Sequence, residues 1–230
     1  GGGEDNIAKG LGATIGGGAG NMALGELATV PGGALNEAEG LTSFAAGRRA
    51  KANHDGAFVW GDSIDADVSS FGNDTFSIRA SGGTRFYSSS DPNKGVKLLA
   101  NDSQWLSLSD RNAKENFEKV DSREILERLA AMPIETWTYR GQDDSIRHIG
   151  PMAQDFHAAF GVGPDDKHIG TMDADGVALA AIQGLLHVVR DKEKEIAALQ
   201  ARTGDLEARL TRLERLVRSR ERPKLSSVGK

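Results

Sequence analysis

The chain has 230 residues, a formal net charge of −5 and no cysteine. The acidic balance argues against nucleic acid as a partner, and the absence of cysteine excludes disulfide bonds and cysteine-ligated metal sites. Hydrophobic residues are only 38% and aromatic residues 6%, and many of the 29 glycines fall in the first third, which argues against one globular core. Neither a signal peptide nor an apolar stretch of about 18 residues is recognised, so we expect no membrane insertion.

Residues 1–62 carry a 15-residue repeat in which an asparagine and a glycine recur. The members are Asn6, Asn21 and Asn36, and Gly10, Gly25 and Gly40. So short a period is too small for two helices but fits one coil of a β-solenoid, with glycine at the corners. We expect the small and β-branched side chains to point inward: Ala8, Ala23, Ala38, Ile15 and Val30. The alternative is a flexible glycine-rich linker, which need not keep this register.

This repeat, closed by the segment 56–63, resembles the head repeats of trimeric autotransporter adhesins. The resemblance implies left-handed β-rolls from three chains that pack together. A coil with so little apolar content cannot bury itself, which is a separate reason to expect partner chains.

Residues 63–108 are expected to form a β-rich neck. Phe76 and Ile78 alternate with polar residues, the glycine pair 82–83 is a turn signal, and Phe86 lies on the expected return strand. Two further strands are expected around Val96 and Leu106.

Residues 109–180 change to helical signals and predict a small α+β domain. Asp121 followed by Glu124 is typical of a helix start, and Pro133 ends that helix. A strand is expected at 134–140 with its return strand at 147–149, and a helix from Pro151 to about Phe160.

Residues 181–220 predict a coiled coil, because apolar residues recur at heptad positions a and d. Lys192 and Thr203 are the only polar members of the set Ile182, Leu185, Val189, Lys192, Ile196, Leu199, Thr203, Leu206, Leu210, Leu213 and Val217. The side chains allow both a dimer and a trimer, and the solenoid resemblance favours three. The alternative is an antiparallel hairpin that turns near Gly204. Residues 221–230 are expected to be a disordered tail.

Three motifs in order resemble the peptidase S74 family, the endosialidase-type intramolecular chaperones. They are Ser109–Phe117 (SDRNAKENF), His148–Phe156 (HIGPMAQDF) and Asp175–Leu185 (DGVALAAIQGL). The resemblance implies a domain that trimerises, guides folding of the upstream fibre and then cuts itself off at the serine. It also assigns Ser109 as nucleophile and Lys114 as general base, with Asp110 and His148 as candidate supporting residues.

This pair is chemically coherent. A serine hydroxyl becomes a good nucleophile when a base takes its proton, and a lysine is a base only when neutral, which burial favours. A site closed by three chains could be dry enough. If Asp110 is a helix N-cap, Lys114 lies about one turn further on and reaches Ser109. On spacing alone these residues would be an ordinary solvated cap, and Ala113 departs from the larger apolar residue expected before the lysine.

The bond that breaks is left open between two. Attack by Ser109 on the carbonyl of Leu108 passes through a five-membered ring and cuts Leu108–Ser109. A cut at Ser109–Asp110 would more easily use a serine of a neighbouring chain, or water.

The sequence thus predicts a mixed, fibrous homotrimer with β-roll or solenoid repeats, a β-rich neck, a small α+β chaperone domain and a C-terminal trimeric coiled coil. It would fold a phage tail fibre or bacterial surface fibre and act once as a self-cleaving serine endopeptidase, in cis or within the trimer. The alternative is a structural trimeric fibre segment that is not cleaved. Expected partners are its own copies, the upstream fibre segment and an unidentified host receptor or glycan. No cofactor or metal is expected.

Overall fold

A computed structural model describes residues 2–221 of the chain, with side chains described as far as Arg220. The chain forms two compact units, Gly1–Glu115 and Asn116–Lys230. The domain boundary predicted between 108 and 109 therefore lies a few residues before the point where one unit gives way to the next. The predicted disordered tail, 221–230, falls outside the described residues apart from Glu221, which ends a helix.

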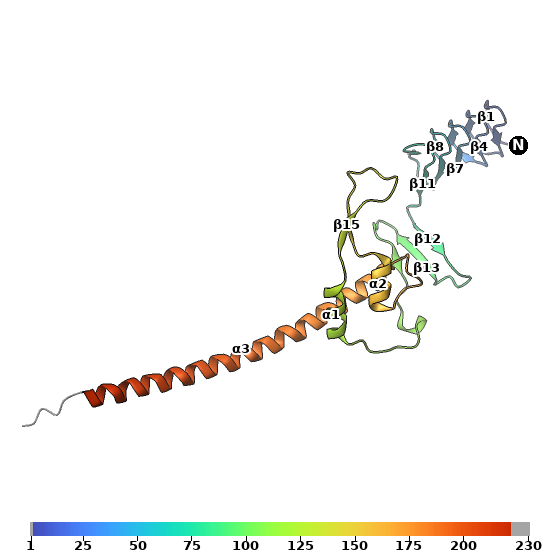
Figure 1. Ribbon diagram of the computed structural model, residues 1–230. Helices are drawn as coiled ribbons and strands as arrows, with labels where there is room; N and C mark the ends of the chain where they lie inside the picture. The colour runs from blue at the N-terminus through green and yellow to red at the C-terminus, as the bar shows by residue number, and fades with distance from the viewer. Residues whose placement is uncertain (1, 222–230) are drawn as a thin grey trace, which may run out of the picture. The chain divides into compact units, whose positions relative to one another are not determined.

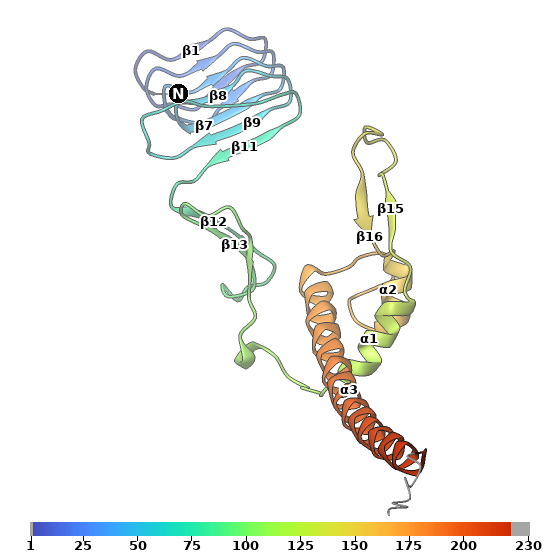
Figure 2. The same ribbon diagram turned by 90° about the vertical axis from the view of Figure 1, so that its left-hand side faces the viewer.

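The first unit begins with a β-solenoid, which confirms the repeat prediction (Figures 1 and 2). Neighbouring strands in both of its sheets pair in parallel, as expected for stacked coils. One sheet contains β1 (Ile7–Ala8), β3 (Met22–Ala23), β6 (Glu37–Ala38), β8 (Ala50–Ala52) and β10 (Val68–Ser69). The other contains β2 (Thr14–Ile15), β4 (Thr29–Val30), β7 (Phe44–Arg48), β9 (Phe58–Gly61) and β11 (Phe76–Arg79), and β5 (Gly33–Ala34) pairs with β7.

The inward positions are those that the repeat predicted, with one exception. Ala23, Val30 and Ala38 are fully buried, and Ile15 packs against the same core. Ala8 was expected inside but is exposed. Its strand β1 lies at the end of its sheet and is covered by a coil on one side only.

An asparagine ladder explains why the repeat keeps a buried asparagine. The side-chain nitrogen of Asn21 donates to Asn6 Oδ1 at 3.1 Å, and that of Asn36 donates to Asn21 Oδ1 at 3.0 Å. The backbone N–H of Ala50 then donates to Asn36 Oδ1 at 3.0 Å. Asn21 and Asn36 are fully buried, so each amide needs these partners. The ladder fixes the register of the stacked coils.

The recurring glycines are required by a close approach of backbones. A Cβ on Gly10 would lie 1.9 Å from the carbonyl oxygen of Gly25, and one on Gly40 would lie 2.0 Å from that of His54. The neighbouring corner position has a positive φ and accepts other residues, including Leu27 at 58° and Thr42 at 54°. Glycine was thus correctly predicted at the corner. It is required because a side chain would have no space there, and not because of a positive φ.

The solenoid continues beyond its predicted end at residue 62. Strand β10 pairs with β8, and β11 pairs with β9 in parallel, with Phe76 opposite Phe58. The rings of Phe44, Phe58 and Phe76 stack with centroids 4.6 and 4.7 Å apart. The predicted hairpin across the glycine pair 82–83 is therefore wrong. The alternation at 76–78 indicated a strand correctly, but its partner is the previous coil.

Asp62 and Arg79 hold the last solenoid loop. Asp62 accepts hydrogen bonds from Arg79 Nε at 2.7 Å and from the Ser81 N–H at 2.8 Å. The guanidinium of Arg79 also donates to the carbonyl oxygens of Ile64 and Ala66. One arginine therefore ties the loop to strand β11.

A three-stranded antiparallel sheet completes the first unit, with β12 (Gly83–Tyr87), β13 (Gly95–Leu99) and β14 (Leu106–Ser107) in that order. The strands expected around Val96 and Leu106 are confirmed. In β13 and β14, Val96 lies opposite Ser107 and Lys97 lies opposite Leu106.

The second unit contains α1 (Ser122–Ala131), β15 (Glu135–Trp137), β16 (His148–Gly150), α2 (Ala153–Phe160) and α3 (Thr171–Glu221). The capping prediction is confirmed, because Asp121 accepts hydrogen bonds from the N–H groups of Arg123 and Glu124. Strands β15 and β16 form the expected antiparallel pair. A small core of Met132, Phe156 and Val177 joins α1, α2 and the start of α3.

Helix α3 is continuous from Thr171 to Glu221, so it passes Gly204 without the turn that the hairpin alternative required. Its helical signal was predicted only from 181, and its first turns belong to the core. A Cβ on Gly184 would lie 2.1 Å from the carbonyl oxygen of Ser122, which shows how closely α1 approaches α3. All the apolar a and d residues from Ile182 to Val217 are exposed.

Among the described residues, α3 is long and apolar enough in one 18-residue window to cross a membrane by length and composition. This differs from the expectation that the chain has no apolar stretch of about 18 residues. A helix that packs in a protein core passes the same test, so this observation is weak evidence for a membrane.

Candidate active site

Ser109 and Lys114 are brought together as their spacing predicted. Lys114 Nζ donates a hydrogen bond to Ser109 Oγ at 2.8 Å, and both side chains are exposed in the single chain. This is the distance at which a neutral amine could accept the hydroxyl proton. The two side chains are therefore within hydrogen-bond distance of each other.

A single 3₁₀ turn, η1 (Arg111–Ala113), produces this contact. Asp110 is its N-cap, and Asp110 Oδ1 accepts from the backbone N–H of Asn112 at 2.9 Å and from its side-chain amide at 3.1 Å. Lys114 is the C-cap in an extended conformation. The predicted N-cap is confirmed, but the turn is shorter and tighter than the helix that was expected. Asp110 shapes the turn and makes no hydrogen bond to either member of the pair among the described contacts.

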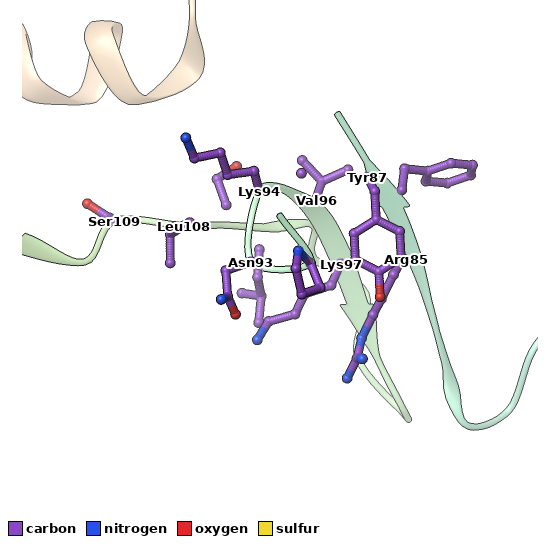
Figure 3. Close-up of a pocket in the computed structure, with 13 residues that line it drawn as sticks. Arg85, Tyr87, Asn93, Lys94, Val96, Lys97, Leu108 and Ser109 are labelled. Carbon is purple, nitrogen blue, oxygen red and sulfur yellow. The ribbon is translucent and has the colours of Figure 1, made fainter. Parts of the chain in front are cut away.

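Two hollows of the first unit are lined by residues of the segment 108–110. One, of about 440 Å³, lies beside strands β12 to β14 and is lined by Ser109, Leu108 and Lys94, among others (Figure 3). The other, of about 590 Å³, is lined by Lys114 together with Leu108, Lys94 and Asp110. Leu108 thus borders both hollows, while Ser109 borders the first and Asp110 the second.

Sequence reasoning did not single out Lys94, although it lines both hollows. It directly precedes β13, whose partner β14 ends two residues before Ser109. The sequence indicates strands around Val96 and Leu106 but not that they pair, so no sequence signal identifies Lys94.

The comparison with known families fits this geometry. The Peptidase_S74 family, described as "Chaperone of endosialidase", matches residues 109–163. The chain contains a peptidase S74 domain. The match starts at Ser109 itself, and it indicates a chaperone role for this part of the chain. No curated protein matches the chain.

The peptidase S74 match includes the first two motifs and ends before the third, 175–185, which lies in α3. It runs from the 3₁₀ turn of the first unit through the hairpin and α2 of the second unit. Autoproteolysis is a property of the peptidase S74 family. Which residues of this chain would perform it is taken up below as a proposal.

His148, the remaining candidate, lies on β16 in the second unit. Its ring stacks on Trp137 with centroids 4.7 Å apart and meets the edge of Tyr139 at 5.4 Å. Its Nε2 lies 3.0 Å from Gln142 Oε1, which belongs to the hairpin turn. These contacts give His148 a structural place in the β15–β16 hairpin, and its support of cleavage stays a prediction.

Proposed function

We propose that the chain is a C-terminal intramolecular chaperone that drives trimerisation and folding of a phage tail fibre or surface fibre, then releases itself by one cut at Ser109. The contact of 2.8 Å between Lys114 Nζ and Ser109 Oγ, at the first residue of the peptidase S74 match, carries this proposal. The alternative, a structural trimeric segment that stays intact, shares the fold but gives no reason for this contact.

The chemistry starts with neutral Lys114. Its amine takes the proton of Ser109 Oγ while the oxygen attacks a peptide carbonyl carbon. For the Leu108–Ser109 bond, the tetrahedral intermediate collapses as the C–N bond breaks, and the departing Ser109 nitrogen takes the proton back from Lys114. The product is an ester between Leu108 and Ser109 Oγ, which water then hydrolyses to a carboxylate and a free hydroxyl.

Assembly would control when this reaction occurs. Ser109 and Lys114 are exposed in the single chain, and water favours the ammonium form of lysine, which cannot act as a base. Contact with neighbouring chains would remove that water. Cleavage would then follow correct assembly, and a fibre that has lost its chaperone could no longer refold, so it would persist kinetically.

Helix α3 supports the homotrimer in this proposal. A single helix that exposes Leu199, Leu206 and Leu213, each by more than half, leaves a long apolar stripe in water. Coiled-coil packing would cover it, because these residues occupy the heptad positions that face partner helices. The solenoid upstream of Ser109 is the folding client, and the fibre would belong to a virion tail or a bacterial surface, where it meets a host receptor or glycan.

The test compares the parent with Ser109→Ala and Lys114→Met chains. Each freshly folded protein is followed over time by intact mass and on a denaturing gel. The parent is expected to convert from 24.4 kDa to two fragments, with the N-terminal fragment ending at Leu108 or Ser109, while both variants stay whole. Lys119→Met is the control, since it removes an exposed lysine of the matched segment without touching the pair.

Light scattering on the same samples measures the number of chains. A parent that assembles but is never cut would favour the structural alternative. Two variants that fragment at the parental rate would remove Ser109 and Lys114 from the mechanism.

A further inference from the structure

The end of β13 that pairs with β14 is preceded by a second lysine, Lys94, which lines a hollow together with Ser109. Val96 lies opposite Ser107 and Lys97 opposite Leu106. If this antiparallel register continued beyond the end of β14, Gly95 would lie opposite Leu108 and Lys94 opposite Ser109. Residues directly opposite each other have Cβ atoms about 5 Å apart.

The surface around the pair agrees with this register. Lys94 and Ser109 line the same hollow, and Figure 3 shows their side chains on one side of the chain, with that of Leu108 on the other. Lys94 also lines the second hollow together with Lys114. Lys94 and Leu108 therefore line both hollows, and Ser109 lines the first.

The charge of Lys94 has no recorded use within the fold. Lys94 forms no ion pair with any carboxylate of the described residues, although Asp91 and Glu115 line the second hollow. Its backbone is fixed, because its N–H donates to the Asp91 carbonyl at 3.0 Å and its carbonyl accepts from Ser88 at 3.3 Å. A cation on a fixed backbone that has no ion-pair partner is available to offset a negative charge that develops nearby.

We infer that Lys94 is the electrostatic stabiliser of the oxyanion that forms on the carbonyl oxygen of Leu108 when Ser109 attacks. This inference rests on the proposed self-cleavage, and it selects the Leu108–Ser109 bond from the two candidates. When Ser109 Oγ bonds to the Leu108 carbonyl carbon, the carbonyl π electrons move to its oxygen, and the Lys94 ammonium offsets that charge. The charge returns to the carbonyl when the C–N bond breaks, so Lys94 exchanges no proton.

The experiment measures the cleavage rate of full chains carrying Lys94→Met or Lys94→Arg. Removal of one oxyanion donor slows enzymes by about 10²–10³-fold, and an exposed lysine is expected to contribute roughly tenfold or more. Lys94→Arg should keep most of the rate, because arginine keeps the charge and cannot act as a base. Lys97→Met is the matched control, since it removes a lysine three residues further along that lines the same hollow but lies opposite Leu106.

Hydroxylamine in the same reactions identifies the bond. An ester at Ser109 reacts with it to give an N-terminal fragment that ends in a Leu108 hydroxamate, which mass spectrometry distinguishes from a carboxylate. Circular dichroism and light scattering on each variant show whether folding and assembly are unchanged.

The outcomes separate the inference from the proposed function. The inference is supported if Lys94→Met is cleaved much more slowly than the parent while Lys94→Arg and Lys97→Met are cleaved at close to the parental rate. Parental cleavage in Lys94→Met, an arginine variant as slow as the methionine variant, or a fragment ending at Ser109 overturns it while self-cleavage stands. A parent that never cleaves overturns both.

Discussion

Gly25 approaches Gly40 so closely that a Cβ on Gly25 would lie 2.1 Å from the carbonyl oxygen of Gly40. No side chain fits at that distance, and the atom it meets belongs to a backbone that the neighbouring coil holds in place. The repeated glycine is therefore a condition for stacking one coil on the next.

Gly25→Ala should accordingly destabilise the solenoid by about 2 kcal/mol or more, as overpacking does. Thermal unfolding followed by circular dichroism measures the effect. Gly82→Ala is the control, because nothing lies within 4 Å of its added Cβ and its φ is not positive. Equal transition temperatures for the two variants would contradict the close approach.

The stability that Asp62 contributes to the last solenoid loop should depend on pH. Hydrogen bonds from the side chain and the backbone N–H of Ser81, followed by that from Arg79, hold the pKa of Asp62 far below its ordinary value of 3.8. A lowered folded pKa stabilises the fold above the unfolded value and loses that contribution as the pH falls toward the folded value. The parent should thus be more stable than Asp62→Asn at neutral pH, and the difference should shrink below about pH 4.

Urea unfolding at several pH values checks this. Glu26→Gln serves as control, because Glu26 is exposed and forms no ion pair within residues 2–220. A difference between parent and Asp62→Asn that stays constant down to about pH 2 would show that the carboxylate does not stabilise the loop.

Helix α3 offers two leucines of equal exposure for a test of assembly. Leu206 and Leu216 are each 53% exposed, but only Leu206 occupies a heptad a or d position. Leu206→Lys should reduce the mass measured by light scattering toward that of one chain, because a charge would be buried among three helices. Leu216→Lys should leave the mass unchanged. If the two variants had the same mass, the assignment of Leu206 to the helix face that contacts partner helices would be wrong.

Two glycines of α3 should respond oppositely to alanine. Gly176 has nothing within 4 Å of an added Cβ, so Gly176→Ala should stabilise the helix by up to about 1 kcal/mol. Gly184→Ala should destabilise the unit, because its Cβ would meet the Ser122 carbonyl of α1. Both are compared by thermal unfolding in a Ser109→Ala background, which removes the proposed nucleophile. Stabilisation by both changes would show that α1 does not pack at Gly184.

The sequence predicted local structure well at positions where a residue type has a single well-known structural role. The repeat of Asn21 and Asn36 predicted coils, and Asp121 predicted a helix start that its hydrogen bonds confirm. The Ser109–Lys114 contact was also expected from spacing, although through a different kind of turn.

Strand partners could not be predicted in the same way. The alternating pattern around Phe76 fits a hairpin as well as a further coil. Only the stacking of Phe76 on Phe58 shows that it belongs to a coil. Lys94 was missed for the same reason, since its nearness to Ser109 depends on which strand β14 pairs with. Periodicity shows that a strand exists, whereas its register depends on side chains elsewhere in the chain.

The asparagine ladder also makes the solenoid divisible. Removing residues 19–33 would join Gly18 to Ala34 and leave Asn6 at the same spacing from Asn36 that it now has from Asn21. The remaining coils would meet through the same hydrogen bonds, because each coil contacts only its neighbours. A gene encoding this chain could therefore shorten or lengthen its rod in whole coils, about 4.8 Å at a time, without redesigning either end.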